Sequence, residues 1–181
     1  MTTTPARERT RHEIVRQAMG LFQDRGYSAV SLQDIASAAG CSKATVLYHF
    51  NGKAAVLAAV LEPAAADLAA LVAAADQLSR AAAQEFAIGE FTDLAVRYRG
   101  VMDVVQELIP FIQEMPELAL LVADGIRLKG FLAGSDDPLE QDLAGFALNG
   151  LTAECRHADG RTDEELHRLC EAALNRLFRP S

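Results

Sequence analysis

Residues 40–53, with the sequence GCSKATVLYHFNGK, bring hydroxyl, phenol, imidazole and ammonium groups together near the N-terminus of the chain. A helix that begins after Ser42 turns Val46, Leu47 and Phe50 toward one side, where they can pack inward. The opposite side carries a small residue, a hydroxyl, a phenol and an imidazole: Ala44, Thr45, Tyr48 and His49. These side chains suit hydrogen bonds and close contacts with base edges and phosphates. The pattern therefore indicates a helix that reads nucleic acid.

The residues that flank this helix support the same interpretation. Ser42 is a good N-cap for it, and Asn51 is expected to cap the next helix and to direct its amides at a phosphate. Lys43 and Lys53 can contact phosphates on either side. Three alternatives stay open: Tyr48 as a packing residue, and His49 and Lys53 as solvated surface residues. The predicted DNA contacts are Ser42, Lys43, Ala44, Thr45, Tyr48, His49, Asn51 and Lys53.

Two further helices are expected before this one. Thr10 and Glu13 have the spacing of a capping box, so the first helix should begin near Thr10 and end at Gly26. Ser31 and Asp34 repeat the signature for a second helix, and residues 40–42 form the short turn of a helix-turn-helix. Residues 1–9 are left as a flexible basic arm, and residues 10–53 as a three-helix DNA-binding domain.

Charge is distributed unevenly between the two parts of the chain. Residues 1–53 contain seven basic and four acidic residues, a net charge of +3. Residues 54–181 contain ten basic and twenty-one acidic residues, a net charge of −11. A basic module on an acidic body is typical of a protein that binds a polyanion at one end only. The alternative is a chance fluctuation of charge in a soluble protein.

Composition favours an all-α fold of about nine helices. Half of the 181 residues are hydrophobic, mostly Ala, Leu and Val, and no run of alternating β-branched residues is evident. The apolar region 54–75 is interrupted by Glu62, Pro63 and Asp67, so we expect no membrane span and no membrane partner. The polar, basic N-terminus lacks the apolar core of a secretory signal. Three cysteines in no framework spacing indicate reduced thiols and a cytoplasmic location.

Residues 10–57, TRHEIVRQAMGLFQDRGYSAVSLQDIASAAGCSKATVLYHFNGKAAVL, resemble the N-terminal domain of the TetR family of bacterial transcriptional repressors. The resemblance implies an all-helical homodimer, associated with the bacterial nucleoid, with a ligand-binding C-terminal domain. It also implies that the recognition-helix contacts fall on Lys43, Ala44, Thr45, Tyr48 and His49, and the phosphate-binding lysine on Lys53. Two positions depart from the family pattern. Leu47 stands where the family often has tyrosine, and Ala44 where it often has glycine.

Residues 54–181 are expected to form a helical ligand-binding and dimerisation bundle. Its first helix should bend, or break into two helices, at Pro63. Later helices are expected around 90–99, 101–109, 116–134, 138–155 and 162–178. In the family, the last two helices form a four-helix dimer interface; the alternative here is an ordinary monomer core. The predicted interface residues are Leu139, Leu143, Phe146, Ala147, Gly150, Leu151, Leu166, Leu169, Ala173 and Leu177.

The middle helices would enclose the ligand, which the composition predicts to be a largely apolar small molecule. Core packing is the alternative for each residue of this stripe. Arg97, Arg99 and Arg127 are candidate charge partners. The predicted pocket residues are Phe86, Phe91, Tyr98, Met102, Val105, Phe111, Met115 and Phe131.

Two interpretations compete for the cysteines and histidines near the C-terminus, a zinc site and structural thiols. Cys155 and His157, followed by His167 and Cys170, supply two sulfur and two nitrogen ligands. Their spacing matches no familiar zinc motif, and small buried cysteines explain Cys155 and Cys170 equally well. We therefore predict no metal and no cofactor.

The leading hypothesis is a repressor that a small molecule releases from a palindromic operator. An enzyme is disfavoured because the chain has no phosphate-binding Gly loop, no H-E-x-x-H and no nucleophile–base pair of recognisable spacing. A protein adaptor that has lost DNA binding is disfavoured by the intact set of Lys43, Thr45, Tyr48, His49 and Lys53.

Overall fold

The computed structural model describes residues 6–156 and 160–178, and every regular element in these ranges is helical. Nine α-helices and two short 3-10 helices follow one another along this part of the chain. The predicted all-α fold of about nine helices is therefore confirmed.

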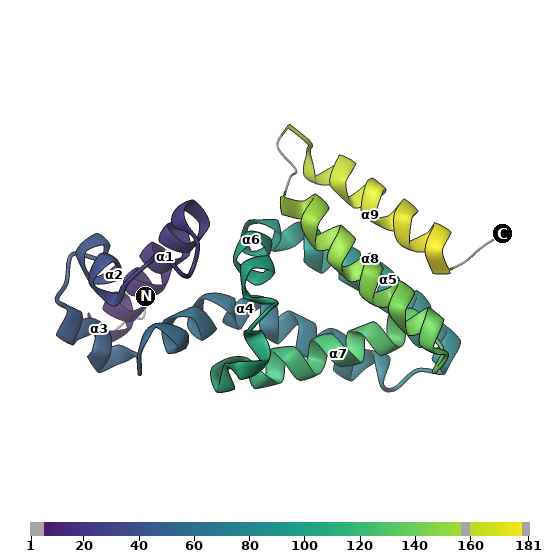
Figure 1. The fold of residues 1–181 in the computed structure, drawn as a ribbon, viewed down its shortest axis with the longest axis horizontal. Coiled ribbons are helices and arrows are strands. Elements are labelled where there is room, and N and C mark those ends of the chain that lie inside the picture. Colours follow the sequence, from purple (N-terminus) through teal and green to yellow (C-terminus); the bar gives the residue numbers. More distant parts are fainter. Residues whose placement is uncertain (1–5, 157–159, 179–181) are drawn as a thin grey trace, which may run out of the picture.

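The first three helices, α1 (Ala6–Arg25), α2 (Leu32–Ala38) and α3 (Lys43–His49), lie together at one end of the molecule (Figure 1). Ser31 caps α2 in a capping box with Asp34, and the Ser42 hydroxyl accepts the Thr45 N–H at 3.0 Å to cap α3. Gly40 takes a φ of +64° between the two helices, which a glycine adopts without strain. The predicted helix-turn-helix is present.

The predicted start of α1 at Thr10 is wrong. The helix begins at Ala6, and the Thr10 hydroxyl donates to the Ala6 carbonyl at 3.1 Å from within the first turns. Glu13 accepts hydrogen bonds from Arg16 and Gln17 rather than from a cap. Residues 6–9, expected in a flexible arm, are thus helical, whereas residues 1–5 of that arm lie outside the described ranges.

Helix α4 (Lys53–Ala75) leads from this unit into the body (Figure 1). It continues without a break through Pro63, so the alternative of two separate helices is excluded, and a bend there stays a prediction. Its N-cap is Gly52, at a φ of +93°, and not the predicted Asn51. By length and composition α4 is apolar enough to span a membrane, but it packs against α1, α5 and α7 as a core helix does.

The body consists of α5 (Arg80–Arg97), α6 (Arg99–Leu108), α7 (Ala119–Ala133), α8 (Pro138–Arg156) and α9 (Asp163–Phe178). Two 3-10 helices, Ile112–Glu114 and Pro116–Leu118, join α6 to α7. Two predicted helix starts are confirmed by their caps. Asp137 accepts the Leu139 N–H at 2.8 Å before α8, and Thr162 forms a capping box with Glu165 before α9.

Two hydrophobic clusters hold the molecule together. One lies within the body, between α4, α5, α7, α8 and α9. The other combines the buried side chains of α1–α3 with Val56 and Leu57 of α4 and with Val101, Val104 and Leu108 of α6. The core beneath the helix-turn-helix is therefore completed by α4 and α6, so these two helices hold α3 in position.

Candidate functional site

Helix α3 presents one exposed face to solvent. Lys43, Ala44, Leu47 and Tyr48 are exposed on it, with Tyr48 66% accessible, whereas Val46 and Phe50 are buried beneath. Thr45 and His49 are half-buried at its edges, and the Thr45 hydroxyl lies 2.9 Å from that of Ser42. The exposed phenol and the small Ala44 are groups that the sequence predicted for contact with bases, and the exposed Lys43 is one that it predicted for contact with a phosphate.

The predicted burial of Leu47 is wrong, because this side chain is 49% exposed. The helix is only seven residues long, and the narrow stripe formed by Val46 and the C-cap residue Phe50 already fills its contact with the core. Leu47 lies one residue beyond that stripe, on the same face as Lys43 and Tyr48. An exposed leucine there supplies an apolar surface of the kind that meets a thymine methyl group.

Two arginines of α1 lie beside α3, which sequence reasoning missed. The Arg7 guanidinium is 5.3 Å from the centre of the Tyr48 ring, and the Arg11 guanidinium is 5.2 Å from that of Phe50. Burial and these two cations lower the pKa of His49, which favours the neutral imidazole. The i, i+4 spacing of Arg7 and Arg11 in the basic N-terminus was the available signal, but residues 1–9, with Arg7, were expected to form a flexible arm.

Lys53 is oriented differently from the prediction. Its ammonium donates to the carbonyls of Tyr27 at 2.9 Å and Val30 at 2.8 Å, and it lies 4.2 Å from the centre of the Tyr27 ring. Burial lowers the pKa of Lys53, and the nearby Glu107 carboxylate partly opposes that effect. In this arrangement Lys53 ties α4 to the turn between α1 and α2. Asn51 is exposed beside α3, so its side chain is free to meet a backbone phosphate.

The same turn is held from the body by α6. Glu107 accepts the backbone N–H groups of Tyr27 at 2.6 Å and Ser28 at 2.8 Å. Burial would raise the pKa of Glu107, but the hydrogen bonds from Ser28 and Tyr27 and the Lys53 charge together lower it. The Gln23 side chain of α1 also donates to the Gly100 carbonyl of α6. Since both contacts span more than seventy residues of sequence, no local pattern predicted them.

An apolar cavity of about 420 Å³ opens in the body among α4, α5, α6, α7 and α8. On α7 the lining follows the set Val122, Gly125, Ile126 and Lys129, with Leu121 and Leu128 at its edges, and on α8 it is the set Gly145, Leu148, Asn149 and Thr152. Each set has i, i+3, i+4, i+7 spacing, so one full face of each helix borders the cavity. Helix α6, which also carries Glu107, contributes Val101 and Val105, and its C-cap residue Ile109 lines the cavity as well.

Of the predicted pocket residues, Phe91 and Val105 line this cavity. Phe86 borders a different surface hollow, Phe131 borders another, and the Tyr98 hydroxyl donates to Asp67 at 2.9 Å. Phe111 and Met115 pack against the cluster beneath the helix-turn-helix. The side chain of Met102 lies outside the described part of the chain. Sequence reasoning favoured large aromatic residues, whereas aliphatic side chains and glycines line the cavity.

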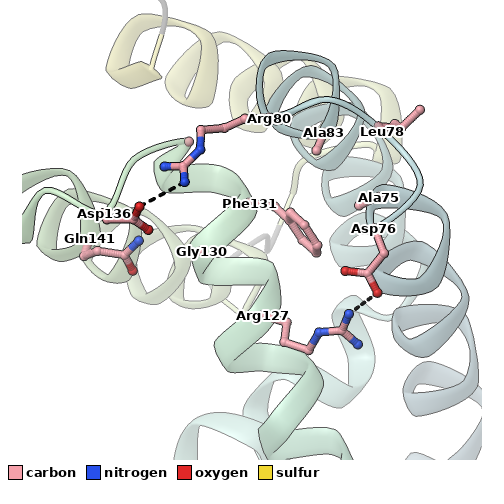
Figure 2. A pocket seen from close by; sticks show the side chains of 11 residues that line it. Ala75, Asp76, Leu78, Arg80, Ala83, Arg127, Gly130, Phe131, Asp136 and Gln141 are labelled. Carbon is pink, nitrogen blue, oxygen red and sulfur yellow. Dashed lines mark hydrogen bonds and ion pairs between the residues drawn. The ribbon is translucent and has the colours of Figure 1, made fainter.

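The arginines considered as ligand partners bind carboxylates elsewhere. Arg97 pairs with Asp67 at 2.8 Å, and Arg99 pairs with Asp163 at 3.2 Å. Figure 2 shows Arg127 directed at Asp76 and Arg80 directed at Asp136, with Phe131 between the two pairs. This second hollow, of about 430 Å³, is bordered by charges that are already paired.

An exposed apolar strip runs along α8 and α9. Leu139 is 65% and Phe146 73% accessible, and Leu169 and Leu177 of α9 are also exposed. Gly150 is exposed as well, and Leu143 and Ala173 are half-buried. The predicted interface needs one correction, because Ala147, Leu151 and Leu166 are buried in the core of the subunit itself. Their side chains pack α8 and α9 against α5 and α7 and present no surface to another chain.

The proposed metal ligands are not gathered in the described ranges. His167 binds Asp93 at 2.8 Å, and His157 lies outside those ranges. Cys155 and Cys170 are buried together between α8 and α9, where contact with Cys170 and burial raise the pKa of Cys155. Within residues 6–156 and 160–178, no group of three or more His, Cys, Asp or Glu side chains has the arrangement of a metal site.

Comparison with known proteins yields matches at two levels. Residues 14–60 match the family model "Bacterial regulatory proteins, tetR family". The HTH-type transcriptional regulator SrpR of Pseudomonas putida is 42% identical over 59 residues, which are 33% of this chain and 28% of that protein. The chain therefore matches less than a third of that relative's length.

Solved structures resemble the whole fold. The TetR family regulator PfmR from Thermus thermophilus has a TM-score of 0.68 at 22% identity, over 99% of this chain and 97% of that one. The regulator FadR from Bacillus subtilis, solved in complex with stearoyl-CoA, has a TM-score of 0.68 at 15% identity, over 94% of this chain and 98% of that one. At these identities the likeness establishes the arrangement of helices.

Proposed function

Through its N-terminal domain the chain belongs to the TetR family of bacterial transcriptional regulators, and we propose that it is a ligand-responsive, sequence-specific repressor. The observation that carries this proposal is the exposed face of α3, where Lys43, Ala44, Leu47 and Tyr48 stand on a rigid, capped helix. A rigid helix of this width fits the major groove of DNA. In this role the protein carries out no catalysis and works in the bacterial cytoplasm, on the nucleoid.

The contacts divide into those that read bases and those that bind phosphates. Ala44, Thr45, Leu47 and Tyr48 face the base edges, where a phenol, a hydroxyl and apolar groups can discriminate between base pairs. Lys43, His49 and Asn51 lie toward the phosphates, together with Arg7 and Arg11 beside α3. Ser42 keeps its hydroxyl on the helix cap. Lys53 acts on DNA indirectly, because its ammonium holds the turn that supports α3.

Two copies of the chain would bind one operator. A two-fold axis beside α8 and α9 would bury Phe146, Leu139, Leu169 and Leu177, which are otherwise exposed apolar residues. Two α3 helices related by that axis can enter successive major grooves about 34 Å apart. The operator would then be palindromic.

Ligand binding would act through α6. This helix borders the apolar cavity with Val101 and Val105, it holds the α1–α2 turn with Glu107, and its Gly100 carbonyl accepts the Gln23 side chain of α1. A ligand that displaces α6 changes the position of the turn, and hence the separation of the two α3 helices. The coupling between ligand and DNA is reciprocal, so the operator would weaken ligand binding by the same factor.

Selection of bound sequences from random duplex DNA at fixed salt tests the proposal. The expected result is an enriched palindrome whose half-sites lie about one helical turn apart. Weak, salt-sensitive binding without any enriched sequence would contradict base reading by α3 and would favour a protein adaptor.

A further inference from the structure

We infer that the apolar cavity takes an apolar monocarboxylate, with the anionic group bound by Lys129. This inference rests on the proposed role of the cavity as the effector site and specifies the chemistry of its ligand. Among the described residues that line the cavity, Lys129 is the one charged side chain.

The cavity offers few other polar groups to a ligand. Aliphatic side chains, Phe91 and two glycines make up most of the lining. Asn149 and Thr152 are the other polar side chains of the lining, and the Thr152 hydroxyl already donates its one proton to the Leu148 carbonyl at 2.6 Å within α8. A ligand that fits this surface is mostly hydrocarbon. The volume of about 420 Å³ is near the lower end of the usual range, about 300–1,000 Å³, and suits one medium acyl chain or a small ring system.

The position of Lys129 places its charge at one end of that hydrocarbon surface. It ends the cavity-facing stripe of α7, after Val122, Gly125 and Ile126. Its stem crosses Gly145 of α8, where a Cβ built on the glycine would lie 3.7 Å from Lys129 Cδ. The lysine stem therefore runs close to the α8 backbone at Gly145, at a distance that corresponds to ordinary van der Waals contact with a Cβ.

The ammonium of Lys129 lacks the partner that neighbouring cations have. Within the described residues, no carboxylate lies within ion-pair distance of it, and it donates no hydrogen bond. Arg127, two residues earlier on α7, points to Asp76 in the other hollow (Figure 2). In a body with a net charge of −11, a half-buried lysine without a counter-ion beside an apolar cavity favours an anionic ligand.

Calorimetric binding of decanoate and decanol to the full chain, without DNA, tests the charge requirement. The two probes share a hydrocarbon chain and differ in the carboxylate, which is ionised at neutral pH. We expect decanoate to bind roughly fivefold more tightly, which corresponds to about 1 kcal/mol, the upper value for a partly solvated charge pair. A matched pair of 1-naphthoate and 1-naphthalenemethanol determines whether a ring system meets the same requirement.

Two variants assign the effect to this site. Lys129→Met keeps the stem and removes the charge, so the preference for the carboxylate should disappear, whereas Arg127→Met should retain it. Gly125→Leu adds a side chain where the structure leaves space, and should abolish binding of both probes. Equal binding of acid and alcohol by the unaltered protein, or a preference that survives Lys129→Met, would overturn the assignment.

Failure of this inference is distinguishable from failure of the proposed function. The binding measurement uses free protein, and the DNA selection uses no ligand. An enriched operator together with equal binding of acid and alcohol would support the repressor function and contradict the carboxylate ligand. Absence of binding of both pairs would overturn the proposed ligand class.

Discussion

Replacing Glu107 with glutamine is expected to weaken the contact between α6 and the α1–α2 turn by about 2 kcal/mol. The carboxylate accepts two backbone N–H groups, those of Tyr27 and Ser28. A hydrogen bond to a charged group contributes about 1.5–3 kcal/mol. The Ser28 N–H is exposed and Glu107 is only half-buried, so water replaces part of both bonds and we take the lower part of that range. Glutamine keeps one acceptor and turns a donor toward the other N–H.

Amide hydrogen exchange at Tyr27 and Ser28 measures this loss directly. A weakening of about 2 kcal/mol corresponds to exchange about thirtyfold faster at these two amides. Glu114→Gln is the matched control, because Glu114 is exposed on the segment after α6. Exchange rates at the turn that are the same in the two variants would refute the role of Glu107.

The stabilising effect of Glu107 on the contact between α6 and the α1–α2 turn should also depend on pH. Hydrogen bonds hold the pKa of Glu107 below its ordinary value of 4.5 in the folded state, although burial opposes them. A group with a depressed folded pKa stabilises the protein above its unfolded pKa and loses that effect as pH falls through the folded value. The difference between the parent protein and Glu107→Gln should therefore be largest above about pH 4.5 and shrink below it. A difference that does not change with pH would show that the charge of Glu107 is not involved.

Three further substitutions test the other contacts. Tyr48→Ala should cost roughly 1–3 kcal/mol of operator affinity and relax base preference, measured by competition binding; an equal loss on random DNA would remove Tyr48 from base reading. Lys53→Met should lower the free energy of unfolding in urea by about 1–3 kcal/mol, because the Tyr27 and Val30 carbonyls lose the ammonium that donates to them and the Tyr27 carbonyl keeps only the Val30 N–H. The slope of log K against log salt concentration for DNA binding by this variant should stay unchanged. A slope shallower by about one would show that Lys53 contacts a phosphate directly. Phe146→Asp should dissociate the dimer in analytical ultracentrifugation, whereas Leu120→Asp, at an exposed leucine of α7, should leave it intact.

Local signals in the sequence located four helix starts correctly, those of α2, α3, α8 and α9. The cap residues Ser31, Ser42, Asp137 and Thr162 each hydrogen-bond a group within three residues, so their partners are visible in the sequence itself. Thr10 carried the same signature and failed, because α1 extends a further turn and gives the hydroxyl a carbonyl acceptor four residues earlier. A capping pattern therefore predicts that a helix is present more reliably than it predicts the residue at which the helix begins.

Helical periodicity predicted the buried and exposed residues of α3 less reliably than the cap residues predicted where α3 begins. It assigned Tyr48 to the exposed face and Val46 to the core correctly, but it buried Leu47. Hydrophobicity alone does not distinguish a leucine that packs from one that faces a partner. The same limit applies to α8, where the apolar pattern joined exposed Phe146 and buried Ala147 in one predicted interface.

By itself the sequence determined the all-α class, the helix-turn-helix with the exposed Tyr48 on its third helix, and the basic end on an acidic body. Each of these depends on residues close together in the chain or on composition. The tertiary structure alone decided that Glu107 holds the α1–α2 turn, that Arg7 lies over Tyr48, and that Lys129 borders an apolar cavity. The physical reason is that these contacts join segments far apart in the chain, whose relative positions are set by how the helices pack.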